Sequence, residues 1–554
     1  MNAPENSSAT KSILSKLSIS LLVAVAFTLT EWPESLKNFI QNCVKFSLPR
    51  EINGSIEGLS ITSPTNISEI DPEIRRGMTG KKLHEVCHMT SLIDHVTKKT
   101  GNDGVIDVGS GLGYLCQVLH CNYGHSVLGL EGKHGHTSGA DKRTHKFERC
   151  HHLHNVTCEL SQQTQSQQEF LSLILDWFSE IKSESTKCCH FKTALKTVKS
   201  HEKNIQTDSS ELHSYDRSGS ELSEKVENNS GNQSALARFS STGSQSNFEN
   251  NPIENTKNKN CNINLHAAVK NYDKGIKDNA FEVCKRKNNF VCDSERDCCL
   301  PDTVVGSDKV NNVPTFCMVG LHCCGDLTPI MLNNFVELDQ ITSLCCVSCC
   351  YHRMNFNEDI QTHDNFPMSQ QLKTALVKTQ QTYPEFKFSS YALRLAAQET
   401  RARWHEQTDE EHDFHMRNVA YRGILETSLL QPDTDETFQL KKNVRKLAHK
   451  ADYQSFTAYI DAVSKHVHTP DTVSLEEFKL KFCQRMHQKL DKYQKYFCLI
   501  EPLTALQYLL QPVLESLIYM DRKQWLCEQG LQADIIPVFD ELISPRNLAL
   551  VAWK

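Results

Sequence analysis

A glycine-rich stretch between two apolar runs is the feature that most restricts the fold of this 554-residue chain. The apolar run 105–108 is followed by alternate glycines over 109–113, a helical pattern over 114–123 and a second apolar run over 126–130. Short apolar runs bounded by glycines are typical of buried strands, so this order predicts a βαβ unit. The two strands of such a unit are parallel.

Further runs extend the unit into a sheet. The segments 315–322 and 341–350 predict two more strands, with a helix between them that begins at Thr328-Pro329, where proline suits a first helical turn. Alternating strands and helices predict a doubly wound, mostly parallel sheet. Pro512 predicts the start of a later helix, and Gly530 predicts its end.

The last two strand-like runs, 534–539 and 547–553, are joined by a turn at Ser544-Pro545-Arg546 that is too short for a crossover helix. They therefore predict an antiparallel hairpin. Among doubly wound folds this is the pattern of S-adenosylmethionine-dependent methyltransferases, whose seventh strand lies antiparallel to the sixth. The predicted fold class is α/β, with a mostly parallel, seven-stranded, Rossmann-like sheet of the class I methyltransferase type.

Composition divides the chain further. Between 182 and 312, Ser, Asn, Lys, Glu and Asp dominate, and such a segment cannot bury enough apolar surface to offset its ordering entropy. It predicts a mostly disordered insertion between two halves of one methyltransferase domain, with an N-terminal helical region before them, and a helical insertion and the closing helix and hairpin after them. The predicted boundaries, in chain order, are 1–75, 76–181, 182–312, 313–430, 431–500 and 501–554.

Charge and cysteine content restrict partners and compartment. With 60 Lys and Arg against 67 Asp and Glu, the chain lacks the overall basic character of a protein that coats nucleic acid non-specifically. The 23 cysteines, many in adjacent pairs, indicate a reducing compartment, so we expect a cytoplasmic or nuclear protein. The apolar segment 19–30 is too short to span a bilayer and predicts a buried helix; no other run reaches spanning length, and we expect no membrane insertion.

The spacing of the glycine loop separates two kinds of nucleotide ligand. After Gly109 and Gly111, Gly113 comes one residue earlier than the pyridine-nucleotide fingerprint requires, which disfavours NAD. The loop fits the one that holds the methionine part of S-adenosylmethionine, with Asp107 ordering the loop and the ligand's ammonium group. Glu131, at the tip of the next strand, is placed to accept hydrogen bonds from ribose hydroxyls. The alternative is a strand–turn–helix that needs glycines only for its turn.

Two further polar loops follow the predicted fourth and fifth strands. The loop 321–328 contains His322 and Asp326, and the loop 348–352 ends in His352. In open α/β sheets ligands lie outside the carboxyl ends of strands, so both loops border the same crevice as the glycine loop. The three side chains are candidate general bases for transfer to an acceptor that carries a proton, and a structural role for either histidine is the alternative.

Several motifs together resemble the methyltransferase-like protein 25 family, over nearly all of the chain except the predicted insertion. The motifs are MTGKKLHEV at 78–86, DVGSGLGYL at 107–115, LHCCGDLT at 321–328, SCCYHRMN at 348–355, FPMS at 366–369, LRLAAQETRARW at 393–404, ESLIYMDRKQWLCEQG at 515–530 and SPRNLALVAWK at 544–554. In the first motif, Gly80 occupies the position at which the family has a proline.

The resemblance implies an S-adenosylmethionine-dependent methyltransferase and places Lys81, Lys82, His84 and Glu85 near the cofactor or the mouth of the site. The third strand, which brings a residue to the adenine in methyltransferases, is expected at 191–198 (FKTALKTV). The full set of predicted cofactor-binding residues is Lys81, Lys82, His84, Asp107, Gly109, Ser110, Gly111, Gly113 and Glu131.

The residues leave the methyl acceptor open. The 349–352 motif (CCYH) is similar, more distantly, to a Cys/His-rich loop of a group of tRNA ribose 2′-O-methyltransferases, so RNA is the first expectation and a protein side chain the second. A scaffold of the same fold that binds cofactor, or only a partner, without turnover is the non-enzymatic alternative.

The cysteines of these loops suggest two further chemistries. Cytosine-5 RNA methyltransferases use cysteines at the ends of the fourth and fifth strands, but neither loop here has a Pro-Cys or Thr-Cys dipeptide. A metal site built from Cys349, Cys350, His352 and His322 ranks below both acceptor hypotheses, because adjacent cysteines are not ordinary zinc spacing. We therefore name no metal ligands at this point.

Overall fold

The computed structural model describes residues 33–52, 64–144, 150–160, 164–183, 313–359, 361–429, 447–467 and 474–554. The predicted buried helix at 19–30 and nearly all of the predicted insertion at 182–312 lie outside these residues.

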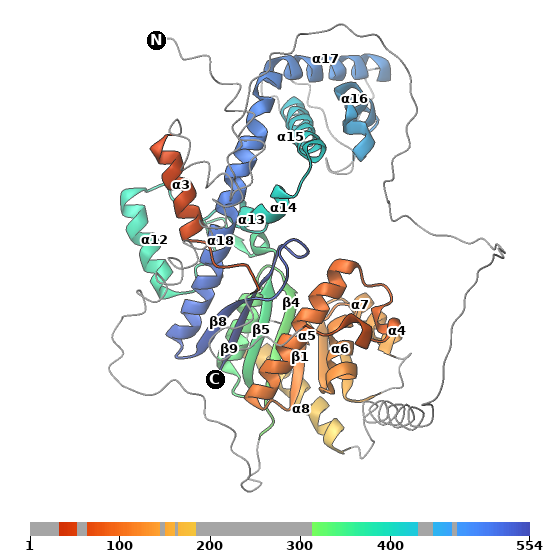
Figure 1. The fold of residues 1–554 in the computed structure, drawn as a ribbon, viewed down its shortest axis with the longest axis vertical. Coiled ribbons are helices and arrows are strands. Elements are labelled where there is room, and N and C mark those ends of the chain that lie inside the picture. The colour runs from red at the N-terminus through yellow and green to blue at the C-terminus, as the bar shows by residue number, and fades with distance from the viewer. Residues whose placement is uncertain are drawn as a thin grey trace, which may run out of the picture.

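A seven-stranded sheet occupies the centre of the described structure (Figure 1). In spatial order its strands are β3 (Leu153–Thr157), β2 (Val127–Glu131), β1 (Gly104–Val108), β4 (Phe316–Cys323), β5 (Ile341–Ser348), β9 (Leu548–Trp553) and β8 (Gln532–Pro537). Neighbouring strands are parallel except for β9, which runs antiparallel to both β5 and β8. The predicted fold class, with its antiparallel C-terminal hairpin, is therefore confirmed.

Helices cover both faces of the sheet. One face carries α8 (Thr164–Ser183), α11 (Leu327–Glu337) and α18 (Ile500–Glu528), and the other carries α5 (Gly80–Thr100) and α6 (Tyr114–Tyr123). Successive residues of a strand point to opposite faces, so Ile106 of β1 packs in the first core and Val105 in the second. Burial on both faces explains why the central strands are continuous apolar runs rather than alternating ones.

Shorter elements surround this framework. They are α3 (Glu34–Lys45), η1 (Ile67–Glu69), α4 (Pro72–Arg75), α7 (His134–Thr144), η2 (Tyr351–Arg353), β6 (Phe356–Asn357), β7 (Thr362–His363), α12 (Gln370–Thr382), α13 (Ser390–Ala396), α14 (Arg401–His405), α15 (Asp409–Leu429), η4 (Lys450–Gln454), α16 (Phe456–Ser464), α17 (Leu475–Tyr493) and η5 (Gln494–Leu499). Helices α15, α16 and α17 enclose an apolar core of their own at the far end of α18 (Figure 1). This core extends the helical region predicted at 431–500 back into α15.

Two predictions about single elements are wrong. The third strand is β3, which precedes the predicted insertion and pairs with β2 from Leu153 to Thr157, so the segment 191–198 does not supply it. Pro512 does not begin a helix but lies inside α18. The turns before it remain helical because Leu509 buries its side chain against Ile40 and Cys43 of α3, which offsets the hydrogen bond that proline cannot make.

One helical stretch of the described chain, Lys479–Glu528, has the length and apolar composition of a membrane span. The prediction that no segment reaches spanning length overlooked it. Along α18 this stretch also carries polar side chains that are buried inside the protein, namely Glu501, Thr504, Gln511, Glu515, Ser516, Asp521 and Arg522.

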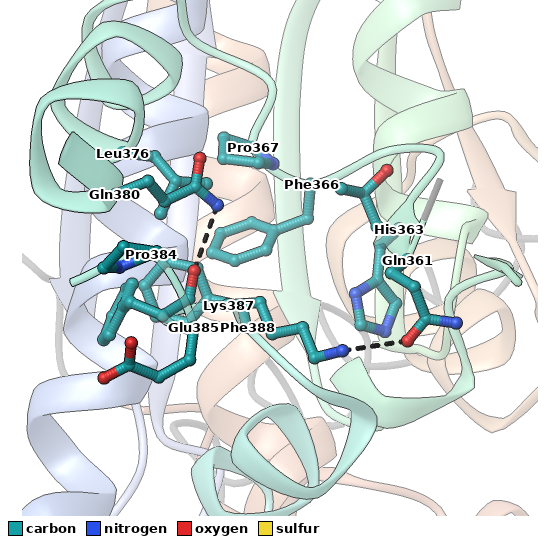
Figure 2. A pocket seen from close by; sticks show the side chains of 12 residues that line it. Gln361, His363, Phe366, Pro367, Leu376, Gln380, Pro384, Glu385, Lys387 and Phe388 are labelled. Carbon is teal, nitrogen blue, oxygen red and sulfur yellow. Dashed lines mark hydrogen bonds between the residues drawn. The ribbon is translucent and has the colours of Figure 1, made fainter. Parts of the chain in front are cut away.

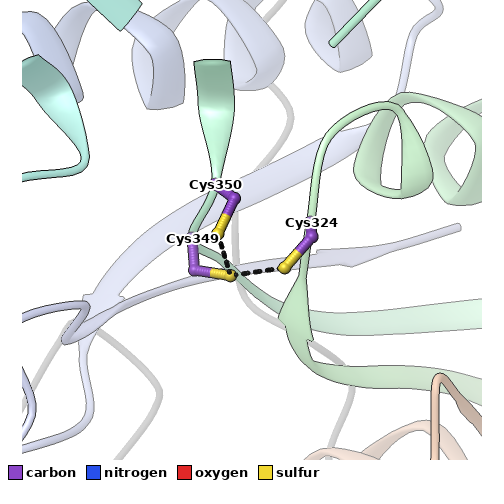
Figure 3. A group of neighbouring side chains, drawn as sticks. All are labelled: Cys324, Cys349 and Cys350. Atoms are coloured by element: carbon purple, nitrogen blue, oxygen red, sulfur yellow. Dashed lines mark hydrogen bonds between the residues drawn. The ribbon is translucent and has the colours of Figure 1, made fainter. Parts of the chain in front are cut away.

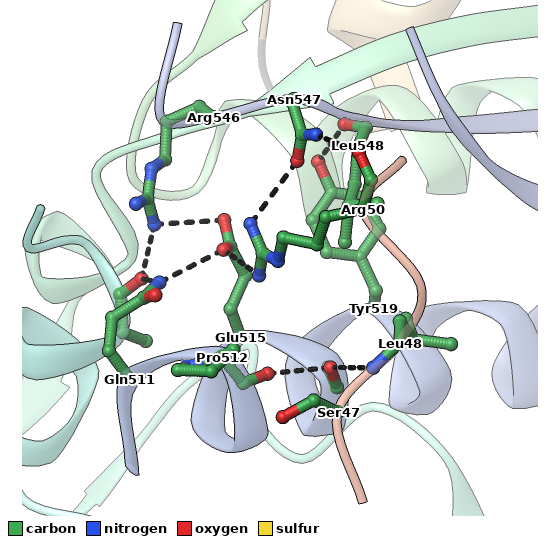
Figure 4. A network of polar contacts seen from close by, with 12 residues as sticks. Ser47, Leu48, Arg50, Gln511, Pro512, Glu515, Tyr519, Arg546, Asn547 and Leu548 are labelled. Carbon is green, nitrogen blue, oxygen red and sulfur yellow. Dashed lines mark hydrogen bonds and ion pairs between the residues drawn. The ribbon is translucent and has the colours of Figure 1, made fainter. Parts of the chain in front are cut away.

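A buried polar network fastens α18 to distant parts of the chain (Figure 4). Glu515 accepts hydrogen bonds from Arg50, from Tyr351 Oη at 2.6 Å and from Gln511 Nε2 at 3.0 Å, and it forms an ion pair with Arg546 Nη1 at 2.9 Å. Burial raises the pKa of Glu515, but the two guanidinium groups outweigh it and lower the pKa below its ordinary value. The carboxylate thus joins α18 to the loop after β5 and to the β8–β9 connection.

Candidate functional site

Left-handed glycines shape the loop between β1 and α6. Gly109, Gly111 and Gly113 have φ angles of 75°, 60° and 72°, a conformation that other residues rarely adopt. A Cβ atom at Gly111 would meet no atom within 4 Å, whereas one at Gly113 would meet Ala140 Cβ at 3.2 Å. Gly113 is therefore required for close packing, while an open space lies over Gly111.

Glu131 connects the tip of β2 to this loop. Its Oε2 accepts a hydrogen bond from the Gly111 N–H at 3.0 Å, and its Oε1 accepts one from the Lys133 N–H at 3.0 Å. The side chain is 12% exposed, and His136 Nδ1 lies 3.3 Å from Oε1. A carboxylate has about four acceptor positions, so Glu131 retains capacity for further donors. The carboxylate and the open space over Gly111 are thus adjacent.

Asp107 and Ser110 contribute polar atoms below the loop. Asp107 is buried in β1, and its Oδ2 accepts a hydrogen bond from Cys116 Sγ at 3.0 Å. Burial raises the pKa of Asp107 to about 6, while the Cys116 hydrogen bond and the charge of Lys82 act in the opposite direction. The Ser110 hydroxyl oxygen is buried and has no hydrogen-bond partner within the described ranges.

Glu85 of α5 is a buried carboxylate shared by four groups. Its Oε1 lies 2.8 Å from Ser544 Oγ and 3.7 Å from Lys81 Nζ, and its Oε2 lies 2.9 Å from His322 Nε2 and 3.4 Å from Lys82 Nζ. Burial raises the pKa of Glu85, but the hydrogen bond and charge of His322, followed by the charge of Lys82, lower it to about 2. Glu85 therefore joins the start of α5, the end of β4 and the β8–β9 connection.

His84 turns toward the β8–β9 connection. Its Nε2 accepts a hydrogen bond from the Asp540 N–H at 3.0 Å, and its ring lies 4.2 Å from that of His88 and 6.2 Å from that of Phe539. Burial lowers the pKa of His84, although Asp540 and Glu85 act in the opposite direction. A neutral imidazole with an accepting Nε2 fits this arrangement.

His322 is the extra residue of a bulge at the end of β4. Leu321 pairs with Val347 and Cys323 with Ser348, so His322 has no opposite residue in β5. Its φ angle is 68°, which costs a non-glycine residue about 1–3 kcal/mol. The side chain is 30% exposed and its Nε2 is bonded to Glu85. Bulges and strained residues of this kind are over-represented at active sites.

The other two candidate bases lie in the loops after β4 and β5. Asp326 Oδ2 accepts a hydrogen bond from the Asn355 N–H at 2.8 Å, and its Oδ1 accepts one from Asn365 Nδ2 at 2.8 Å. These bonds connect the loop after β4 to the segment after β5. His352 is partly buried in η2, directly after β5.

The cysteines of these loops differ in surroundings. Cys323 is buried and its thiol contacts Met331 Sδ at 3.5 Å; burial raises its pKa well above the ordinary value, so it is a packing thiol rather than a nucleophile. Cys324, Cys349 and Cys350 lie together and form the one group of three potential metal ligands that the described residues contain. Neither His322 nor His352 belongs to that group.

A cavity of about 290 Å³ lies outside this arrangement (Figure 2). It is bounded by the segment 361–367, by α12 and by the segment 384–388, and Lys387 Nζ donates a hydrogen bond to Gln361 Oε1 at 2.9 Å across its rim. None of its lining residues comes from the loops after β1, β2 or β4. We therefore place the candidate site at the glycine loop and at the ends of β2 and β4.

Sequence reasoning missed several residues that shape this site. Ser544 was noted only as part of a turn, yet it bonds to Glu85 from 459 positions away. Asn355, the last residue of the 348–355 motif, and Asn365 both donate hydrogen bonds to Asp326, and no sequence pattern predicted these contacts. The capping of α5 by Thr79, whose hydroxyl accepts a hydrogen bond from the Lys82 N–H at 3.2 Å, was readable from its position before the helical pattern.

The sheet order and the glycine loop define a class of protein, the Rossmann-like methyltransferases. The comparisons agree with this class: a family model described as a methyltransferase domain matches residues 81–357, half of the chain. The chain belongs to this methyltransferase domain family.

Two curated relatives extend the similarity beyond the family model. The chain is 26% identical over 494 residues to the human protein named probable methyltransferase-like protein 25, and 24% identical over 505 residues to the mouse protein of the same name. Each match covers 86% of this chain and 75% of the relative. The predicted resemblance to that group is confirmed. No solved structure matches the chain.

Proposed function

We propose that this chain binds S-adenosylmethionine between the glycine loop and Glu131 and transfers its methyl group to RNA. The observation that carries the proposal is the hydrogen bond between the Gly111 N–H and Glu131 Oε2, beside the open space over Gly111. This hydrogen bond places the backbone of the loop after β1 next to the carboxylate at the end of β2. A ligand that has both a ribose and an amino-acid part can contact both groups at once.

The residues of the loop fit this cofactor on independent grounds. Gly111 leaves room where a side chain would stand, and the buried Ser110 hydroxyl can bond to a polar group of the ligand. Glu131, which already has three groups around its carboxylate, retains an acceptor position for a ribose hydroxyl. The bound cofactor would supply an electrophilic methyl group on a sulfonium. The protein's own contribution is mainly to align the acceptor with that group and exclude water.

For an acceptor that carries a proton, His322 is the residue best placed to act as general base. Glu85 holds its Nε2, which fixes the ring and leaves Nδ1 directed elsewhere. Glu85 is then a positioning residue. Asp326, whose two carboxylate oxygens both accept hydrogen bonds from the segment after β5, and His352 rank behind it in this proposal.

RNA is favoured as acceptor by the similarity of the 349–352 motif to tRNA ribose 2′-O-methyltransferases and by the lysines beside the site. Lys81 and Lys82 lie at the start of α5 with partly exposed side chains, where they can contact phosphate oxygens. A protein side chain is the second candidate acceptor. A reducing compartment, cytoplasmic or nuclear, is part of the proposal.

The cofactor half of the proposal is tested by calorimetric titration with S-adenosylmethionine, S-adenosylhomocysteine and NAD. We expect binding of the two sulfur compounds and not of NAD. Gly111→Ala should weaken binding by at least about tenfold, because its Cβ enters the open space. Gly101→Ala is the matched control. Gly101 also has a positive φ, 66°, and an open Cβ position, but it ends α5 just before β1, at the other end of that strand from the glycine loop.

The acceptor half is tested by transfer of a labelled methyl group to fractionated cellular RNA and protein. The proposal is supported if RNA becomes labelled and if His322→Ala lowers the rate of that labelling by about 10²–10⁴-fold while cofactor affinity stays unchanged. Label in protein alone would replace RNA with the second candidate. Cofactor binding without label in either fraction would favour a scaffold, and preferential NAD binding would contradict the cofactor assignment itself.

A further inference from the structure

Three cysteine side chains from two loops converge at the carboxyl ends of β4 and β5 (Figure 3). Cys324 Sγ lies 3.0 Å from Cys349 Sγ, and Cys349 Sγ lies 3.7 Å from Cys350 Sγ. All three sulfur atoms lie within 4.8 Å of one another. Of the 16 free cysteines in the described parts of the chain, only these three form such a group.

The convergence of the adjacent pair depends on where β5 ends. Neighbouring residues of an extended strand point to opposite faces, so two adjacent cysteines within a strand cannot share a ligand. Cys350, however, has left the strand: its φ and ψ are −98° and 67°, and it precedes η2. Its side chain therefore turns to the same side as that of Cys349, which is the arrangement that Figure 3 shows.

The third thiol is held against this pair by close backbone packing. Gly325 has a φ of 58°, and a Cβ there would lie 2.8 Å from the carbonyl oxygen of Arg353. Its N–H donates a hydrogen bond to the Cys350 carbonyl at 3.2 Å. Only glycine permits this approach, which sets Cys324 beside Cys349 and Cys350. The three thiols are thus placed by the backbone of both loops, a form of preorganisation.

The sulfur separations suit a tetrahedral metal ion better than a disulfide. A Zn–S bond of about 2.3 Å gives sulfur–sulfur edges of about 3.8 Å in a tetrahedron, close to the 3.7 Å between Cys349 and Cys350. Cys324 would move outward from Cys349 by less than 1 Å, roughly, to reach that edge. A disulfide needs about 2.05 Å and uses only two of the three sulfurs.

The surroundings leave a path for an ion. Cys324 and Cys350 are partly exposed and Cys349 is 9% exposed, whereas the packing thiols nearby, Cys323 and Cys346, are fully enclosed. A metal centre that keeps one ligand position for water or another group needs this combination of three fixed ligands and an open side.

We propose that Cys324, Cys349 and Cys350 bind a zinc ion as three thiolates, with water as the fourth ligand. As each Zn–S bond forms, the thiol loses its proton to solvent and the thiolate donates an electron pair to the ion. Neither the sulfur nor the zinc changes oxidation state. The ion would tie the loop after β4 to the loop after β5, beside the candidate site. This proposal does not depend on the proposed methyl transfer, because metal binding is measured directly.

The first test measures zinc in the full chain, purified under reducing conditions and dialysed against a weak chelator, by mass spectrometry of metals. We expect about one zinc per chain. Cys324→Ala, Cys349→Ala and Cys350→Ala should each weaken zinc binding by about a hundredfold. Cys527→Ala, which removes an exposed cysteine of α18 outside the group, is the matched control and should leave zinc content unchanged.

A second test needs no variant and covers the case in which a substitution disturbs folding. Thiols of the wild-type chain are alkylated with and without zinc, and the modified peptides are mapped. Zinc should protect the three proposed ligands while the exposed Cys498 and Cys527 react equally in both samples. Equal reactivity of all five with and without zinc, or a Cys324–Cys349 disulfide in reducing buffer in place of bound metal, would overturn the proposal.

Discussion

Replacing Glu85 by Gln tests whether this carboxylate holds the site together. Its pKa of about 2, compared with an ordinary 4.5, means that the folded structure favours the charged form. At about 1.4 kcal/mol per pKa unit, the difference corresponds to about 3 kcal/mol of stability at pH 7. Glu85 is 1% exposed, so solvent screening does not discount this value appreciably.

The sign of the pH dependence follows from the direction of the shift. A carboxylate whose pKa is lowered on folding contributes its full stability above the unfolded value, near 4.5, and loses it as the pH falls toward about 2. The Gln variant has no charge to lose at this position. The stability difference between wild type and Glu85→Gln should therefore be constant from pH 7 to about 5 and shrink by about 1.4 kcal/mol per unit below that.

Hydrogen exchange read by mass spectrometry on peptides from α5 and the end of β4 gives the local opening free energy that this prediction concerns. Glu73→Gln is the control, because Glu73 forms an exposed pair with Arg76 and should change stability by less than about 0.5 kcal/mol. A Glu85→Gln cost no larger than that of the control, or a difference that does not shrink in acid, would refute the reasoning.

Two further predictions concern stability elsewhere. Gly80→Pro should stabilise the chain by about 0.4–1 kcal/mol in thermal melting. Gly80 is the first residue of α5, Thr79 before it is extended, and a Cβ atom at Gly80 would have no atom within 4 Å. A lower melting temperature than that of the wild type would contradict this prediction. Glu515→Ala should destabilise the domain by about 3–5 kcal/mol, because it leaves the buried guanidinium of Arg50 without its carboxylate. Chemical denaturation measures the free energy of unfolding of both proteins. A decrease below roughly 1 kcal/mol would argue against a stabilising role of the network.

Helices and strands were predicted correctly where their own residues carry a clear pattern, such as an apolar run or glycines at both ends. Helix α6 was predicted at its observed bounds because left-handed glycines, Gly113 and Gly124, stand at both ends. Strand β3 was missed because it lies at the edge of the sheet, with only Leu153 and Asn155 buried, and so has no apolar run. An edge strand next to histidines and asparagines differs little from a loop in sequence.

The site shows the same division between local and distant information. The position of Glu131 relative to Gly111 follows from the length of a βαβ unit, and the structure brings the two together. The partners of Glu85 come from β4 and from the β8–β9 connection, and no spacing in the sequence predicts them. The cysteine group was set aside for a similar reason, because the end of β5 at Ser348, which turns Cys350 back toward Cys349, is a property of the sheet.

The bulge at His322 decides which side chain at the end of β4 faces α5. In a regular strand Leu321 and Cys323 would share a face, yet Leu321 packs in the core beneath α5 and Cys323 in the core beneath α11. The one extra residue therefore directs the His322 ring toward Glu85, at the cost of its left-handed backbone. His322→Gly and His322→Ala both remove the imidazole ring, but only glycine adopts the left-handed backbone without strain. His322→Gly should therefore be about 1 kcal/mol more stable than His322→Ala in chemical denaturation. The two variants should lose methyl transfer to the same extent. Equal stability of the two variants would mean that β4 ends without the bulge, and the argument that places His322 beside Glu85 would fail with it.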